Sequence, residues 1–432
     1  MGRRGWLAAA GVVIVAGCAL AGGAIWRGHA NGGESPVPVP VASSPRPTAV
    51  QVDAAAKAAV DAVLRRRAAA VLEKNEAQFL ADVDPGNKKL LAAQKVLFGN
   101  LVQFGFAKLS YVPGQPQVRQ PLIDQYGPST YLVSVAMRYQ IRGIDEQPVE
   151  TALGYLYVQR DGRYVLIDDT QLDVGLPRGS HREAWDFGPV LVRRGTRALA
   201  VVEPGNAKLA ASILADAETA VRTVNKRWLA SWRGGGLVIA LTLKEEHVRG
   251  IDFANPQGEF LATMTQVYRT LPSETQKYGT YGGGYVVVNP SDRYELDAPR
   301  LVHEFTHVAV MAYGPWAPRW LAEGAAGYVE SQPVAGEPDA DLDRYRKVAR
   351  ADYLSKANTL PSDEQFYKTP DSSYAIGWLA VDHLVRKYGQ AKVLRLYQEL
   401  ASRGTDQNQR DLIMTTQLGR TEQQLFADLK RG

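Results

Sequence analysis

The sequence predicts an α+β fold with an N-terminal membrane anchor, a first domain of helices followed by strands, and a second domain that ends in a mainly helical lobe. Three observations lead to this prediction. No charged residue lies between Arg4 and Arg27, strand-like alternation begins at residue 131, and apolar residues recur at helical spacing over most of the chain after Asp297. With 432 residues, 45% of them hydrophobic, the chain can bury the cores of two or three domains.

Residues 1–28 are predicted to be a transmembrane signal anchor. The uncharged run Gly5–Trp26 would span about 33 Å as a helix, and Arg3 and Arg4 before it place the body of the protein outside the cytoplasm. The alternative is a lipoprotein signal, because Val15-Ala-Gly-Cys18 matches the motif for cleavage and lipidation at Cys18. Both alternatives give an extracytoplasmic body, which a proline-rich linker over residues 29–50 holds off the membrane.

Cysteine count and charge exclude several classes of function. Cys18 is the only cysteine, so the body has no disulfide, no thiolate metal ligand and no cysteine nucleophile. The net charge of +5 is mild, and no basic run is interleaved with aromatic residues. We therefore expect no nucleic-acid partner, and contact with the membrane only through the N-terminal segment.

Residues 51–175 are predicted to form the first α+β domain. Its expected elements are two helices, 52–83 and 88–106, and three strands, 131–139, 154–159 and 163–167. The last two strands pair across the turn Asp161-Gly162. Helices followed by a curved antiparallel sheet resemble the NTF2-like cone. Since no residue marks a ligand site, we expect a structural or substrate-presenting role.

Residues 185–432 are predicted to form the second domain. It begins with a hairpin of 190–194 and 198–202 around Gly195, a long amphipathic helix 206–232 and a buried strand 237–243. Its last part is predicted to be helical over 344–355, 374–388, 390–402 and 422–430.

The run Leu301-Val-His-Glu-Phe-Thr-His-Val308 carries the clearest chemical signal. On a helix, His303 and His307 lie on one face one turn apart, so both imidazoles can reach a single cation, and Glu304 lies on the flank of that face. The helix is expected to begin at the N-cap Asp297 and to end at Gly314-Pro315.

A third ligand is predicted at Glu323, on a second helix that Pro318 begins. The short link favours antiparallel packing, which brings Glu323 back to His303 and His307. We expect one Zn²⁺ per chain with one open coordination position. Glu330 lies on the same face as Glu323 and is predicted either to accept a hydrogen bond from a ligand imidazole or to be an exposed polar residue.

The motif HEFTH followed by WLAEGAAGYVE resembles the gluzincin metallopeptidases, a clan MA-like group related to aminopeptidase N. A second match is the segment from Tyr374 to Leu384, which resembles the family's Y-x-x-G-x-x-V-x-x-L. The resemblance implies a zincin-type, thermolysin-like domain over residues 185–432 that hydrolyses peptide or protein substrates. It implies that Glu304 is the general base for a zinc-activated water and that Tyr374 donates a hydrogen bond to the oxyanion of the tetrahedral intermediate.

The resemblance leaves two questions open. The Gly-rich strand Tyr281–Pro290 resembles the family's substrate-pairing edge strand, and the alternative is a plain core strand with a Gly-rich turn. Val288 precedes Asn289 where aminopeptidases carry a glutamate, which favours an endopeptidase. The alternative function is a catalytically silent cell-surface binding or assembly protein that retains the peptidase fold. Of the other histidines, His181 and His247 are predicted to be surface or packing residues, and His383 is predicted to be structural.

Overall fold

The computed structural model describes residues 54–117, 119–170, 183–186, 188–228, 232–242, 263–269, 281–288, 293–294, 296–332 and 340–432. The predicted anchor 1–28, the linker 29–50 and the two histidines His181 and His247 lie outside these ranges. Within them, no helix combines the length and apolar character needed to cross a membrane.

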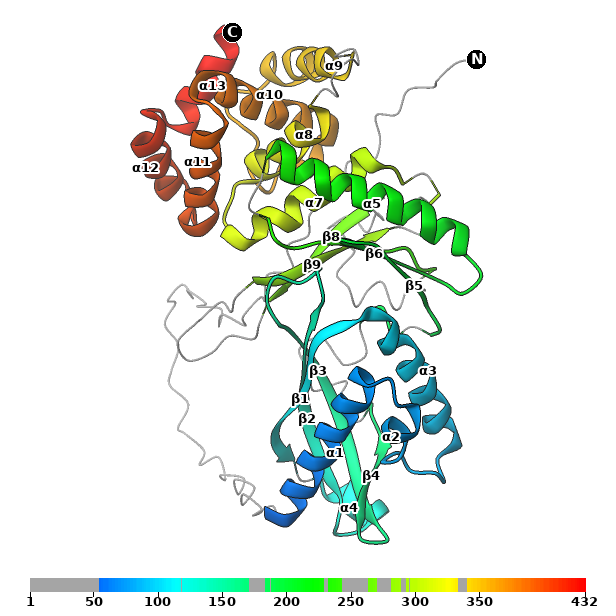
Figure 1. The fold of residues 1–432 in the computed structure, drawn as a ribbon. Coiled ribbons are helices and arrows are strands. Elements are labelled where there is room, and N and C mark those ends of the chain that lie inside the picture. Colours follow the sequence, from blue (N-terminus) through cyan, green and yellow to red (C-terminus); the bar gives the residue numbers. More distant parts are fainter. Residues whose placement is uncertain are drawn as a thin grey trace, which may run out of the picture.

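The first domain packs helices against one antiparallel sheet (Figure 1). The helices are α1 (Ala54–Leu72), α2 (Glu76–Leu80), α3 (Lys88–Phe104) and α4 (Gln120–Tyr126). The strands are β1 (Phe106–Gln117), β2 (Tyr131–Ile141), β3 (Val149–Arg160) and β4 (Arg163–Asp168), in the order β1-β2-β3-β4. The helix predicted over 88–106 and the hairpin across Asp161-Gly162 are confirmed, and both turn residues have positive φ.

Three features of this domain differ from the prediction, and one of them is the helix α4, which was not expected. The helix predicted over 52–83 is broken, because Lys74 adopts a left-handed conformation and Asn75 caps α2 by accepting a hydrogen bond from the Gln78 amide. The strand β1 was not predicted, because Pro113 and Pro116 argue against a strand. β1 tolerates these prolines because it lies at the edge of the sheet.

The second domain is built on a five-stranded sheet. Its order is β5 (Leu191–Arg194), β6 (Ala198–Val202), β7 (Gly236–Ile239), β9 (Tyr281–Val288) and β8 (Thr263–Arg269). β6, β7 and β9 are parallel, whereas β5 and β8 are antiparallel to their neighbours. The predicted hairpin and buried strand are thereby confirmed, and the long helix is α5 (Ala207–Arg227).

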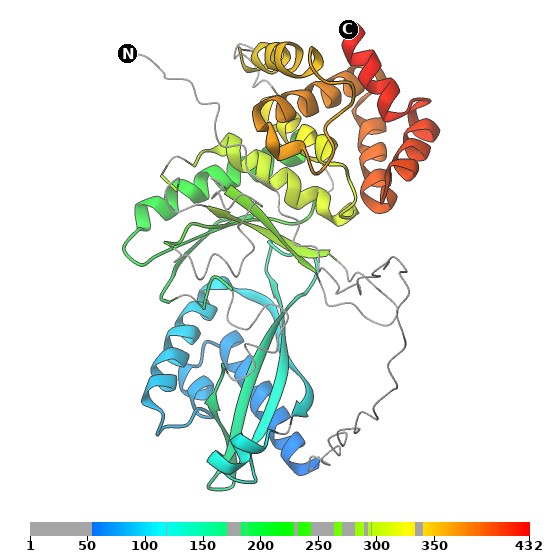
Figure 2. The same ribbon diagram turned by 180° about the vertical axis from the view of Figure 1, so that it is seen from behind.

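Both faces of this sheet are buried, as the alternation along β6 shows. Ala198, Ala200 and Val202 face α5 and the helices above the sheet, whereas Leu199 and Val201 point into the core shared with the first domain. In Figures 1 and 2 the sheet accordingly lies between the helical layer and the first domain. One continuous apolar core therefore joins the two domains.

The prediction that Tyr281–Pro290 forms the edge strand is wrong, and the alternative of a core strand is confirmed for Tyr281–Val288. β9 lies between β7 and β8, so among the described strands β8 forms that edge of the sheet. The glycines serve another contact, because the Gly282 carbonyl accepts hydrogen bonds from the Glu146 and Gln147 amides of the first domain, both at 3.0 Å. A Cβ at Gly282 would approach Val149 to 2.4 Å. The preference for an endopeptidase depends on the missing glutamate and stays a prediction.

The C-terminal lobe is helical, as predicted. Its elements are α7 (Ala298–Val310), α8 (Arg319–Ser331), α9 (Ala340–Val348), α10 (Pro370–Tyr388), α11 (Gln390–Arg403), α12 (Gln407–Leu418) and α13 (Glu422–Arg431). The sequence did not predict α12, which is largely polar and begins at the N-cap Asp406.

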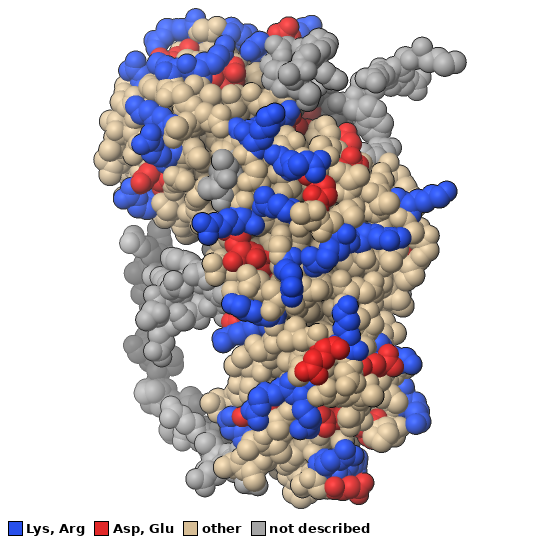
Figure 3. Space-filling view, in the orientation of Figure 1, with Lys and Arg blue, Asp and Glu red and all other residues tan. Residues whose placement is uncertain are grey.

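On the face shown in Figure 3, acidic and basic side chains are interspersed over both domains.

Two glycines set the approach of α8 and α10. A Cβ at Gly324 would lie 2.3 Å from the Gly377 carbonyl oxygen, and a Cβ at Gly377 would lie 2.7 Å from the Trp320 carbonyl oxygen. Gly324 of the WLAEG motif and Gly377 of the segment from Tyr374 to Leu384 are thus required where the backbones of the two helices touch.

We expect Gly377→Ala to destabilise the protein by about 1–3 kcal/mol, because the added methyl group must push α10 away from α8. Unfolding in guanidinium chloride measures the change. The matched control is Gly99→Ala in α3, where a Cβ meets nothing within 4 Å, and this variant should be as stable as the parent or more so. Equal stability of Gly377→Ala and the parent would contradict the close contact.

Candidate metal centre

The helix α7 carries the first two predicted ligands. Its N-terminus is capped as expected, since the Asp297 carboxylate accepts a hydrogen bond from the Arg300 amide at 3.0 Å. His303 and His307 follow one turn apart with ring centroids at 4.9 Å, and both are buried. The helical period therefore places the two imidazoles on one face, away from water.

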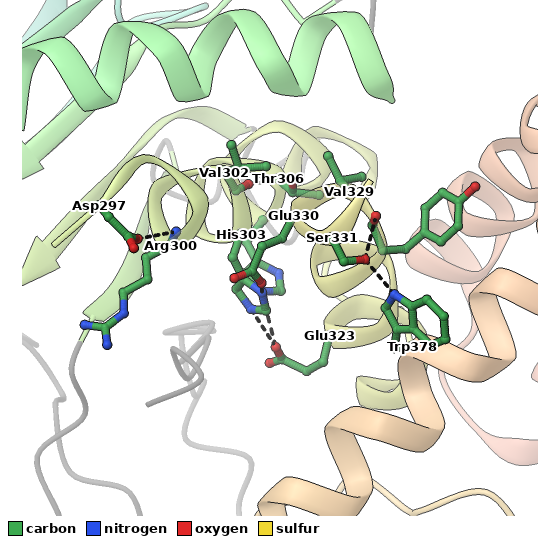
Figure 4. Close-up of polar contacts among 12 residues, drawn as sticks. Asp297, Arg300, Val302, His303, Thr306, Glu323, Val329, Glu330, Ser331 and Trp378 are labelled. Atoms are coloured by element: carbon green, nitrogen blue, oxygen red, sulfur yellow. Dashed lines mark hydrogen bonds and ion pairs between the residues drawn. The ribbon is translucent and has the colours of Figure 1, made fainter. Parts of the chain in front are cut away.

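The third ligand, Glu323, lies on α8. A single 3-10 turn and Gly314 end α7, and Pro318 begins α8, so Glu323 comes back to the histidines. Its side chain points toward His303 in Figure 4, with Oε2 3.2 Å from His303 Nε2. The same Oε2 atom lies 3.3 Å from His307 Nε2. One ligand atom from each of the three residues lies within 4.8 Å of the others. The convergence of the three predicted ligands is confirmed.

The residues present fit a zinc ion. His307 Nε2 is buried and makes no hydrogen bond, although Glu323 Oε2 lies 3.3 Å away, as expected of two atoms that face a shared metal. Burial alone would raise the pKa of Glu323, but His307 and His303 lower it to about 2, so the carboxylate keeps its charge. Two imidazole nitrogens and one carboxylate oxygen are the donor set of a catalytic zinc site with one position open.

Glu330 fixes the protonation of one ligand. Its Oε2 atom lies 3.1 Å from His303 Nδ1, and because a carboxylate only accepts, the imidazole is the donor. The proton on Nδ1 leaves Nε2 free for the metal. Of the two roles predicted for Glu330, the acceptor of a ligand imidazole is therefore confirmed.

Glu330→Ala is expected to weaken zinc binding by about 10–100-fold, because His303 loses the acceptor that orients it. Competition with a chromophoric chelator measures the affinity. Glu330→Gln retains a side-chain acceptor and should lose less. Zinc affinities that do not differ among the parent and both variants would contradict this role.

Glu304 and Tyr374 also lie at the centre. Glu304 is 1% exposed on the ligand helix. Tyr374, from α10, has its ring centroid 6.3 Å from that of His303 and 5.1 Å from that of Phe366. Burial, with the nearby carboxylates Glu323 and Glu304, raises the pKa of Tyr374 well above its usual value, so its hydroxyl remains a donor. The position suits the predicted roles of both residues, which stay predictions.

One residue of the site was not predicted. Tyr367 donates a hydrogen bond to Glu323 Oε1 at 3.1 Å. It lies 44 residues from Glu323 in a 3-10 turn, outside any motif, so no local pattern indicated it. His383, in contrast, is half-buried in α10 and is not part of the ligand cluster, and burial lowers its pKa.

Comparisons with known proteins add similarity at low sequence identity. No protein-family model matches the chain, and no curated protein matches it. Among solved structures, the chain is similar to an M1 zinc metallopeptidase from Deinococcus radiodurans, with a TM-score of 0.35, 16% identity and coverage of 75% of this chain and 60% of that one. Yeast LTA4 hydrolase in complex with bestatin gives a TM-score of 0.32 and 13% identity, over 61% of this chain and 40% of that one.

A mutant of the Deinococcus enzyme bound to a Tyr-Ser-Ala substrate gives a TM-score of 0.34 and 17% identity, over 75% of this chain and 70% of that one. The chain spans about three fifths of the Deinococcus enzyme in the first comparison and two fifths of the yeast enzyme. Because these TM-scores and sequence identities are low, the zinc ligands are assigned from the geometry of this chain alone. His303, His307 and Glu323 form its metal centre.

Proposed function

We propose that this chain is an extracytoplasmic zinc metallopeptidase that hydrolyses peptide bonds. The observation that supports this function best is the buried set His303, His307 and Glu323 around one point, with the carboxylate of Glu304 on the same helix. The sequence resemblance to gluzincin peptidases points to the same chemistry.

Glu304 and Tyr374 have separate roles in the proposed reaction. When bound, zinc supplies a Lewis acid and a water of lowered pKa. Glu304 takes the proton of the attacking water and passes it to the leaving amine, which is general base and then general acid catalysis by one carboxylate. Tyr374 donates its hydroxyl proton in a hydrogen bond to the oxyanion that develops on the scissile carbonyl.

An extended substrate would pair with β8. Among the described strands β8 has one neighbour, β9, and its backbone lies against α7, which carries the histidines. A strand edge next to the metal centre offers main-chain hydrogen bonds to a peptide of many sequences. The proposed substrates are therefore peptides or proteins held in extended form.

The proposed location is the outer face of a cell membrane. Arg3 and Arg4 followed by the uncharged run Gly5–Trp26 support a single-pass anchor, and the motif ending at Cys18 supports a lipid anchor in its place. Both would keep the metal centre outside the cytoplasm.

The test is metal analysis and peptide hydrolysis by a soluble body that begins near residue 48. We expect one zinc per chain, cleavage of an unbiased peptide library, loss of cleavage with a chelator and its return with zinc. A protein that holds one zinc per chain but cleaves no member of the library would refute the peptidase function and favour the catalytically silent binding protein.

A further inference from the structure

The two carboxylate oxygens of Glu323 have different partners. Oε2 faces the Nε2 atoms of His303 and His307 at 3.2 Å and 3.3 Å. Oε1 instead accepts the hydroxyl of Tyr367 at 3.1 Å. A carboxylate can bind a cation through one oxygen or through both, and here one oxygen is already engaged by the protein.

The direction of the Tyr367 hydroxyl is fixed by Arg319. Arg319 Nη1 donates to the Tyr367 oxygen at 2.7 Å, and its guanidinium carbon lies 4.7 Å from the centroid of the Tyr367 ring. A guanidinium is only a donor, so the single hydroxyl proton is left for Glu323.

Arg319 is itself held in place by Asp363. Its amide, at the first position of α8, donates to Asp363 Oδ1 at 2.7 Å. The other oxygen of Asp363 accepts from Arg410 Nη2 of α12, also at 2.7 Å. A continuous set of contacts therefore runs from α12 through Asp363, Arg319 and Tyr367 to the ligand Glu323.

We propose that Tyr367 is a positioning residue that holds Glu323 Oε1 away from the metal, so that Glu323 binds through Oε2 alone. Arg319 orients the Tyr367 hydroxyl for this task. The inference rests on the zinc centre of the proposed function. Single-oxygen binding keeps the fourth coordination position open, which a catalytic site requires and a second carboxylate oxygen would crowd.

The test is Tyr367→Phe in the full-length protein, purified in detergent. Zinc affinity by chelator competition should fall by about 10–100-fold, because the ligand loses its orienting partner. The Co²⁺-substituted variant should also show weaker visible absorption than the parent, since binding through both oxygens raises the coordination number. The matched control is Tyr353→Phe, which removes a hydroxyl that donates to the Thr359 carbonyl in the same lobe and should leave both measurements unchanged.

Arg319→Met provides the second arm. It keeps the backbone contact with Asp363 but removes the guanidinium, and its effect on zinc affinity should disappear in the Tyr367→Phe background if Arg319 acts through Tyr367. Additive effects of the two substitutions would overturn the role of Arg319. Zinc affinity and a Co²⁺ spectrum equal to those of the parent in Tyr367→Phe would overturn the role of Tyr367. A parent protein that binds no zinc would instead refute the metal centre itself.

Discussion

Glu304→Gln is expected to lower kcat for peptide hydrolysis by about 10²–10⁴-fold while the protein keeps one zinc per chain. Glutamine has nearly the same shape as the buried glutamate but cannot take a proton from water at neutral pH. Because Glu304 is not one of the converging ligands, the metal should be held as before. Steady-state kinetics on a cleaved peptide and metal analysis of the same sample measure the two quantities.

The pair of measurements separates two outcomes for Glu304. Loss of kcat together with loss of zinc would mean that Glu304 acts by holding the metal, which contradicts the proposed role. A variant that retains the parent kcat would exclude Glu304 as the general base. The melting temperature of each sample serves as the control for folding.

Glu323→Ala is expected to reduce zinc affinity by more than the 10–100-fold typical of residues that only orient a ligand, since it removes a ligand itself. Hydrolysis at limiting zinc should disappear with it. Zinc at about 100 times its Kd stabilises the folded parent by about 2.7 kcal/mol, so the parent should melt at a higher temperature with zinc than without. The variant should show no such increase at the same zinc concentration.

A matched control for this variant is Glu364→Ala, which removes an exposed carboxylate close to Asp363 in the chain. It should keep both the zinc affinity and the zinc-dependent rise in melting temperature. If Glu323→Ala still binds one zinc per chain with the parent affinity, the ligand set His303, His307 and Glu323 is wrong.

The sequence predicted the metal centre well because its ligands are close along the chain. His303 and His307 are related by one helical turn, and a short link returns Glu323 to them. Tyr367 could not be predicted in this way, because only the packing of the lobe brings its turn to Glu323. Tyr374 was found through a family motif, and the structure places it near His303.

The sequence predicted individual helices and strands more reliably than their arrangement relative to one another. Apolar runs in the sequence predict β5, β6, β7 and β9 of the second sheet, but they indicate neither β8 nor the order of the strands, and β8 rather than β9 forms the edge among the described strands. Order depends on contacts between distant segments, such as those of Gly282 with Glu146 and Gln147, which leave no local pattern. β1 was missed because Pro113 and Pro116 are tolerated only at a sheet edge that the sequence does not reveal.

The shared core below the five-stranded sheet has a consequence for how this protein can be divided. A fragment that starts at residue 183 would carry every zinc ligand yet present Leu199, Val201 and Ile239 to solvent, because these side chains pack against the first domain. An apolar surface of that kind promotes self-association. The first domain therefore covers the apolar underside of the sheet, and any fragment that carries the metal centre without this domain would need another apolar partner.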